Sequence, residues 1–106
     1  FQKTYLFYLD LLKLLEKFPK KDRYGLGLKI ENNCLMLLEF IIAAEQTVTV
    51  LKDKKLLEAS IKTEILKILL RICLERKLIK ETNYFLMTSR LIEIGKMIGG
   101  WRKSLR

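Results

Sequence analysis

Lysine and arginine are the residue types in this chain best suited to a functional role, because phosphates attract both side chains and release condensed counterions on contact. They gather in short clusters where several cations could act together on a polyanion or an acidic protein surface. Each cluster by itself is typical of a solvated helix end, so only their combination indicates a binding surface. The candidate binding residues are Lys20, Lys21, Arg23, Arg76, Lys77, Arg102, Lys103 and Arg106.

The overall charge supports the same interpretation. The 106 residues include 21 lysines and arginines against 12 aspartates and glutamates, a formal net charge of +9. Residues 1–49 hold 7 basic and 6 acidic side chains, a balance of +1, and residues 50–106 hold 14 and 6, a balance of +8. The surplus favours an anionic partner, and it leaves open whether that partner is RNA, DNA or protein.

Residue types that catalyse reactions are scarce. The chain has no histidine, the usual general base, and the GLG of residues 25–27 is too short to cradle a phosphate as a P-loop does. Glu39 and Glu45 lack the Glu-x-x-His spacing of a di-iron bundle, and two cysteines without histidine cannot build an ordinary zinc site. Cys34 and Cys73 lie in apolar context, which predicts core packing. The sequence therefore predicts a protein that is not an enzyme and uses no metal or cofactor.

The elements that position these residues are helices, because apolar residues recur at spacings of three and four in four successive segments. Each segment is long enough for several helical turns, and a single proline and five glycines leave little material for the turns of a β-sandwich or barrel. The four predicted apolar stripes are Tyr5, Tyr8, Leu12 and Leu15; Ile30, Cys34, Leu37, Ile41, Ala44 and Val48; Leu57, Ile61, Ile65, Ile68 and Ile72; and Tyr84, Met87, Leu91, Ile94, Ile98 and Trp101.

Three connections separate these helices. The proline that follows Phe18 disfavours helical conformation there and ends the first helix, and Asp22 should lie at the positive end of the second. The β-branched residues 47–50 (TVTV) predict the second connection, with Asp53 as the N-cap or a first-turn residue of the third helix. The fourth helix should begin near Glu81 or the residue after it.

Four amphipathic helices with short connections favour an all-α, up-and-down antiparallel four-helix bundle, because each short loop returns the next helix beside its predecessor. We expect a single domain over residues 1–106. In this topology the first and third connections share one end of the bundle, so the cluster at Lys20 should approach Arg76 and Lys77. Arg102 and its neighbours should lie at the other end, near Lys52.

Two stretches are more apolar than a four-helix core requires, since residues 34–44 contain one charged side chain and residues 65–74 contain two. A helix that is apolar over a wide arc must bury its second side against something else. Neither stretch offers the roughly 20 nearly uncharged residues of a membrane span, so self-association is favoured over membrane insertion. We expect a homo-oligomer with Gly95, Gly99 and Trp101 at a close-packed contact.

Three segments carry a resemblance to a known family: FPKKDRYGLGLKI at residues 18–30, LLRICLERKLI at 69–79 and IGKMIGGW at 94–101. Over almost its whole length, and in matching order, the chain resembles the four-helix-bundle family of the accessory variability determinant (Avd) of diversity-generating retroelements. Relatives of that family include proteins encoded in intervening sequences of bacterial 23S ribosomal RNA genes. The resemblance implies a homopentameric, barrel-like assembly whose positive surface binds an error-prone reverse transcriptase and its template RNA.

The resemblance also leaves an alternative, a self-assembling protein of the ribosomal intervening-sequence type with a structural or interaction role. The IGKMIGGW segment favours the Avd-like side, as does the lack of an NIAEG-like stretch, in whose place residues 32–40 read NNCLMLLEF. Lys80 stands where the family often has a capping serine at the start of the fourth helix. Two isolated cysteines and the absence of a signal-like segment predict a reducing, cytoplasmic environment.

Overall fold

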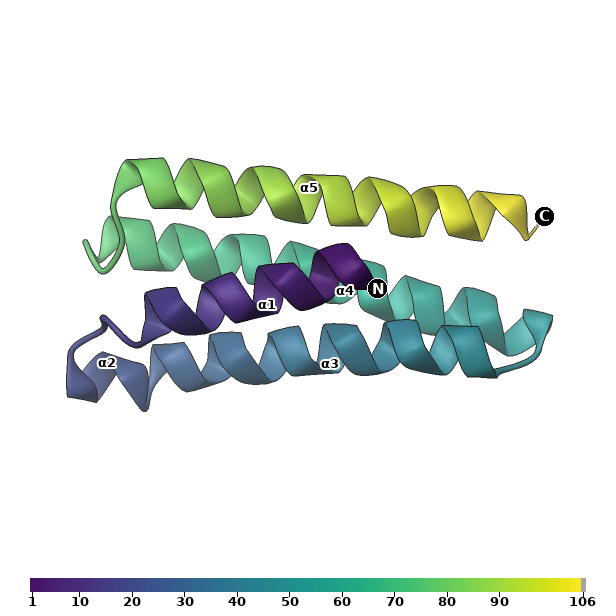
Figure 1. Cartoon of the computed structure of the whole chain (residues 1–106), viewed down its shortest axis with the longest axis horizontal. Coiled ribbons are helices and arrows are strands. Elements are labelled where there is room, and N and C mark those ends of the chain that lie inside the picture. Colours follow the sequence, from purple (N-terminus) through teal and green to yellow (C-terminus); the bar gives the residue numbers. More distant parts are fainter. Residues whose placement is uncertain (106) are drawn as a thin grey trace.

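A computed structural model describes residues 1–105. Over these residues the chain forms four long helices and one short one: α1 (Gln2–Leu15), α2 (Lys20–Arg23), α3 (Leu26–Gln46), α4 (Thr49–Glu75) and α5 (Glu81–Ser104). The long helices lie side by side and alternate in direction (Figure 1), which confirms the predicted all-α, up-and-down bundle. α1 is the shortest of the four and covers only the half of the bundle that carries α2.

The core is one cluster of buried apolar side chains drawn from all four long helices. The predicted stripe of α3 is buried except for Val48, which follows the helix and is 67% exposed. In α5 the middle of the predicted stripe is buried, and Tyr84 and Trp101 pack partly buried against the core. Full burial of one such large side chain contributes roughly 1.5–3 kcal/mol. The largest fully buried apolar side chains are Phe7, Leu11, Ile30, Leu37, Leu56, Leu66, Leu70 and Leu91.

The predicted stripe of the first segment is right only at Leu15, and that of the third segment is wrong, because the neighbouring face of each helix is the more deeply buried one. In α1, Tyr5 is exposed and the buried residues are Thr4, Phe7, Leu11 and Leu15. In α4, Leu57, Ile61, Ile68 and Ile72 are exposed, and the buried residues are Leu56, Ala59, Thr63, Leu66, Leu70 and Cys73. Both faces are apolar, so periodicity alone does not choose between them. α4 packs against both α3 and α5, and the small Ala59 and Thr63 allow that close packing.

The helix boundaries confirm two predictions and correct two others. The first connection lies at the predicted proline, and α5 begins at Glu81. Asp22 lies in α2, a separate turn that Gly25 divides from α3, so the long second helix begins later than predicted. Asp53 is neither an N-cap nor a first-turn residue, because α4 already begins at Thr49. The low helix propensity of β-branched residues costs only about 0.7 kcal/mol or less each, which the packing of a long helix outweighs.

α4 ends in a Schellman motif that fixes the connection to α5. The N–H of Leu78 donates to the carbonyl of Cys73 at 2.8 Å, and the N–H of Lys77 donates to the carbonyl of Leu74 at 3.0 Å. Lys77 has a φ of 61°, a left-handed conformation that glycine usually occupies because it has no Cβ. A lysine in this conformation costs roughly 1–2 kcal/mol. The connection is therefore held in a defined shape with a cationic residue at its tightest point.

Candidate nucleic-acid interface

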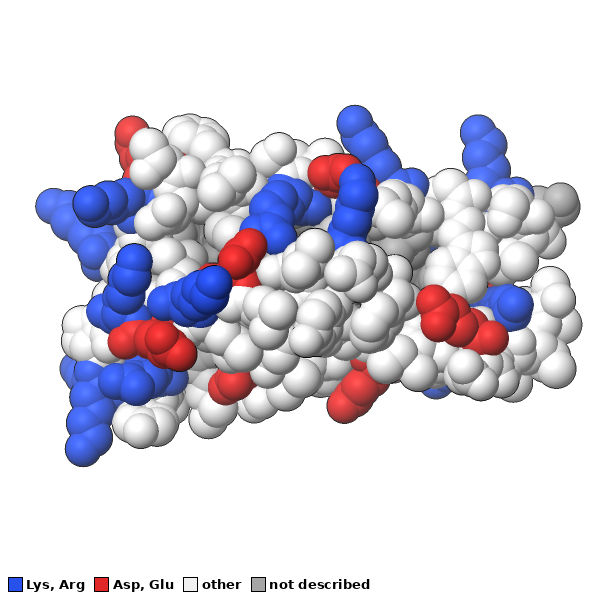
Figure 2. Space-filling model, in the orientation of Figure 1, with Lys and Arg blue, Asp and Glu red and all other residues white. Residues whose placement is uncertain are grey.

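The two connections that carry basic clusters meet at one end of the bundle. Arg76, which follows α4, donates from Nη2 to Oδ1 of Asp22 in α2 across 3.4 Å, and this confirms that the first and third connections share an end. The space-filling view shows lysines and arginines gathered at this end, on the left in Figure 2. We call this surface the basic end, and it comprises Lys17, Lys20, Lys21, Arg23, Arg76, Lys77 and Lys80.

Most of these cations are exposed and have no acidic partner. Among residues 1–105, Arg76 is the member of the basic end that forms an ion pair, and its partner Asp22 is largely covered. Lys20, Lys21 and Lys77 are exposed and have no ion pair within that part of the chain. Arg23 lies over the ring of its neighbour Tyr24, with 5.9 Å from Cζ to the ring centroid. Uncompensated charge of this kind attracts a polyanion.

The second predicted cluster, at the end of α5, lies at the opposite end of the bundle. Arg102 donates from Nε to Oδ1 of Asp53 across 3.0 Å, so the end of α5 is tied to the start of α4. Arg102 is largely covered, whereas Lys103 is exposed. Arg106 lies outside the described residues. The guanidinium of Arg102 thus has an internal partner.

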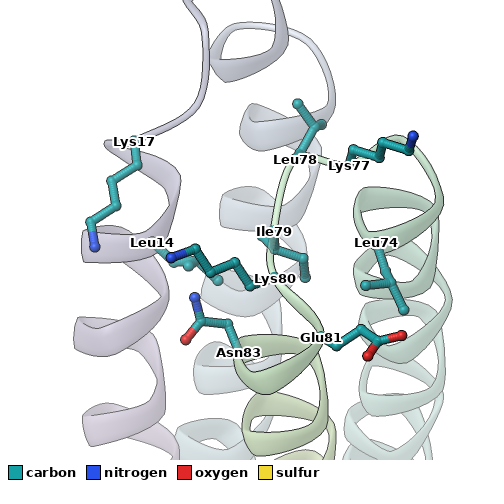
Figure 3. A pocket seen from close by; sticks show the side chains of 9 residues that line it. All are labelled: Leu14, Lys17, Leu74, Lys77, Leu78, Ile79, Lys80, Glu81 and Asn83. Carbon is teal, nitrogen blue, oxygen red and sulfur yellow. The ribbon is translucent and has the colours of Figure 1, made fainter.

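A cavity of about 730 Å³ opens between the end of α1, the α4–α5 connection and the first turn of α5 (Figure 3). Lys17, just beyond α1, and Lys80 of the connection border it, and Asn83 of α5 lies beside them. The remaining wall is largely aliphatic. The lining residues are Leu14, Lys17, Leu74, Lys77, Leu78, Ile79, Lys80, Glu81 and Asn83.

Sequence reasoning found part of this arrangement. Lys17 belongs to the basic cluster predicted at the first connection, and Lys80 belongs to the cluster predicted at the third. Asn83 is a single amide in a helix, and no pattern in the sequence distinguishes it. Lys80 is the N-cap of α5 and makes no side-chain capping hydrogen bond, so its ammonium group remains free to face the cavity.

The residues predicted for an oligomer contact lie in different environments within the chain. A Cβ at Gly95 would lie 3.7 Å from Oγ1 of Thr63, so Gly95 lies close to α4. A Cβ at Gly99 would meet nothing within 4 Å, and Gly99 lies on the exposed side of α5. Trp101 is partly buried against the core. Exposed apolar side chains also lie along α4, including Ile61 and Ile68 at 48% and 62% exposure.

The two cysteines are free thiols buried in the core. Burial raises the pKa of the Cys34 thiol to about 12 and that of Cys73 to about 11, which keeps both protonated at neutral pH. Within residues 1–105 no three cysteine, aspartate and glutamate side chains are grouped so that they could hold a metal ion. No helix of the described chain is long and apolar enough to cross a membrane.

Fold and charge together define the class of this molecule as a small, basic four-helix bundle with a cluster of lysines and arginines at one end. A family model described as bAvd-like matches residues 1–105. The chain belongs to this family, which confirms the resemblance carried by residues 18–30, 69–79 and 94–101. A search of curated proteins finds no match.

Proposed function

We propose that this protein is a non-catalytic accessory protein of a diversity-generating retroelement, which binds the reverse transcriptase and its template RNA in the cytoplasm and supports mutagenic cDNA synthesis. The observation that carries the proposal is the basic end, where exposed lysines and arginines from three separate segments meet in a member of the bAvd-like family. Phosphates are the partners that such a surface favours, and contacts to phosphates are tolerant of sequence. The polymerase supplies all of the chemistry.

The working unit is proposed to be a homo-oligomer, a pentamer by analogy with the family. The exposed apolar residues of α4 support self-association, since a monomer in water leaves Leu57, Ile61, Ile68 and Ile72 partly uncovered. Gly99 offers a place on α5 where another subunit could approach the backbone. Assembly would also multiply the basic ends that one RNA molecule contacts.

Charge reversal at exposed lysines tests the RNA contact without disturbing the fold. Lys21 and Lys77 are suitable because neither has an ion pair within residues 1–105, whereas Arg76 holds Asp22. The Lys21→Glu/Lys77→Glu variant should lose most of its affinity for template RNA at moderate salt. Lys52→Glu/Lys54→Glu, with the same charge change at the opposite end, is the control and should lose less. Equal affinities for both variants would contradict the placement of the RNA at the basic end.

Genomic neighbourhood provides an independent test of the retroelement assignment. A reverse transcriptase gene and a template repeat beside this gene are expected. A location inside a ribosomal RNA gene would instead support the intervening-sequence alternative.

A further inference from the structure

The cavity at the α4–α5 connection differs from the rest of the basic end because it is concave and has both cations and an apolar wall. Figure 3 shows that the side chain of Lys80 extends toward α1, where Lys17 and Leu14 lie, and that Asn83 lies on the same side. Lys77 points away from this group, on the outer side of the turn. Lys80 and Asn83 therefore extend into the space between α1 and α5, and Lys17 borders the same cavity from the end of α1.

These polar groups are free to contact a ligand. Lys17, Lys80 and Asn83 have no ion pair or side-chain hydrogen bond to any residue of the described chain. Glu81 also borders the cavity, but its carboxylate points toward α4 and away from the two lysines (Figure 3). Lys17, Lys77 and Lys80 outnumber Glu81 among the lining residues, so the cavity has a net positive charge.

The wall beside these cations is aliphatic. Ile79 is buried at 7% exposure, and Leu14 and Leu78 are partly buried at the edge of the core. A phosphate alone would gain nothing from this wall, whereas the flat face of a nucleobase would shield these aliphatic side chains from water. The volume of about 730 Å³ lies within the range of roughly 300–1,000 Å³ that is common for small-ligand sites.

We propose that this cavity binds one unpaired nucleotide of an RNA strand. Lys17 and Lys80 hold its phosphate, the base lies against Leu14 and Ile79, and the Asn83 amide hydrogen-bonds to a base edge. The inference rests on the proposed function, because it specifies how RNA is held at the basic end. A duplex fits these features less well, because its bases are stacked on one another and none has a free face to lie against the aliphatic wall.

A second, smaller cavity continues the first along the groove between α1 and α5. Its volume is about 180 Å³, and it shares Leu14, Lys17 and Asn83 with the larger one. Lys13 borders it and has no ion pair within residues 1–105, while Arg90 is paired with Asp10 across 2.7 Å. We therefore expect the RNA strand to continue from the larger cavity toward Lys13. Arg90 is already paired with Asp10, so the row of unpaired cations ends before it.

The test compares short single-stranded RNA with an RNA duplex by fluorescence anisotropy. For Lys17→Gln/Lys80→Gln we expect the affinity for the single strand to fall by about tenfold or more. The slope of log affinity against log salt should fall by roughly 0.7 for each phosphate that the variant no longer binds. Affinity for the duplex should change much less. The matched control, Lys52→Gln/Lys54→Gln, removes two cations at the other end and should behave like the wild type with the single strand.

Asn83→Ala separates base recognition from charge. It should alter the preference among single-stranded homopolymers and leave the salt dependence unchanged. If Lys17→Gln/Lys80→Gln matches the control, or weakens single strand and duplex equally, the nucleotide site is overturned while the proposed RNA binding stands. If the wild type binds no RNA at all, both proposals are overturned. Circular dichroism of each variant confirms that the bundle has folded.

Discussion

Lys77 provides a perturbation whose effects on stability and on binding have opposite signs. Its backbone φ of 61° is left-handed, a conformation that costs an L-residue roughly 1–2 kcal/mol. Helices usually have glycine at this position. Lys77→Gly removes this strain, and the greater freedom of glycine in the unfolded chain offsets about 0.5–1 kcal/mol of the gain. The net expectation is a stabilisation of about 0.5–1 kcal/mol.

The expected stabilisation corresponds to a rise of roughly 2–8 °C in Tm for a domain of this size. The same substitution removes an exposed cation of the basic end, so RNA affinity should fall. Thermal unfolding followed by circular dichroism and RNA titration of the same preparation measure both effects. Lys77→Ala is the matched control, because it removes the charge but keeps a Cβ at positive φ. It should show the same decrease in RNA affinity without a gain in Tm.

A lower Tm for Lys77→Gly would refute the assignment of strain to this turn. An equal rise for Lys77→Ala would show that charge repulsion, and not the backbone conformation, destabilises the wild type. Unchanged RNA affinity in both variants would remove Lys77 from the proposed binding surface and leave the rest of the basic end to be tested.

Three further predictions concern the core, the oligomer and the far end. The unfolded thiols ionise above about pH 9 while Cys34 and Cys73 stay protonated, so stability should fall by about 1.4 kcal/mol per pH unit per thiol between pH 9 and 11. In denaturant titrations a Cys34→Ala/Cys73→Ala variant should lose less stability over that range, and an identical decrease would argue against buried thiols. Gly99→Trp should yield smaller species in light scattering with unchanged helicity, because it meets open space within the chain; an unchanged mass would remove Gly99 from the interface. A double-mutant cycle on Arg102→Ala and Asp53→Ala should give a coupling of about 0.2–1 kcal/mol, and a coupling of zero would mean that the pair does not form in solution.

The helices and their order follow from the sequence, because apolar residues at spacings of three and four in segments this long are typical of helices and not of strands. The buried faces of α3 and α5 were predictable for the same reason. The buried faces of α1 and α4 were not, because each helix has apolar residues on two faces. Which face is buried depends on tertiary packing, such as the approach of Gly95 to Thr63, and that contact joins residues far apart in the chain.

The candidate site also has one part that the sequence predicts and one part that it does not. The approach of Lys20 and its neighbours to Arg76 follows from topology alone, since an up-and-down bundle brings those connections together. The cavity does not, because it depends on where α1 stops and on the left-handed turn at Lys77. A lysine in that turn gives no sequence signal, as a glycine would. Asp53 was misplaced because the β-branched residues Thr49 and Val50 before it are already helical, so α4 begins at Thr49.

The most direct measurement is cDNA synthesis by the reverse transcriptase that the proposed function expects beside this gene, on its own template RNA, with and without the purified protein. The proposed function predicts that cDNA accumulates only when the protein is present, and that the Lys21→Glu/Lys77→Glu variant supports much less of it. Equal cDNA synthesis in the absence of the protein would contradict an accessory role in reverse transcription.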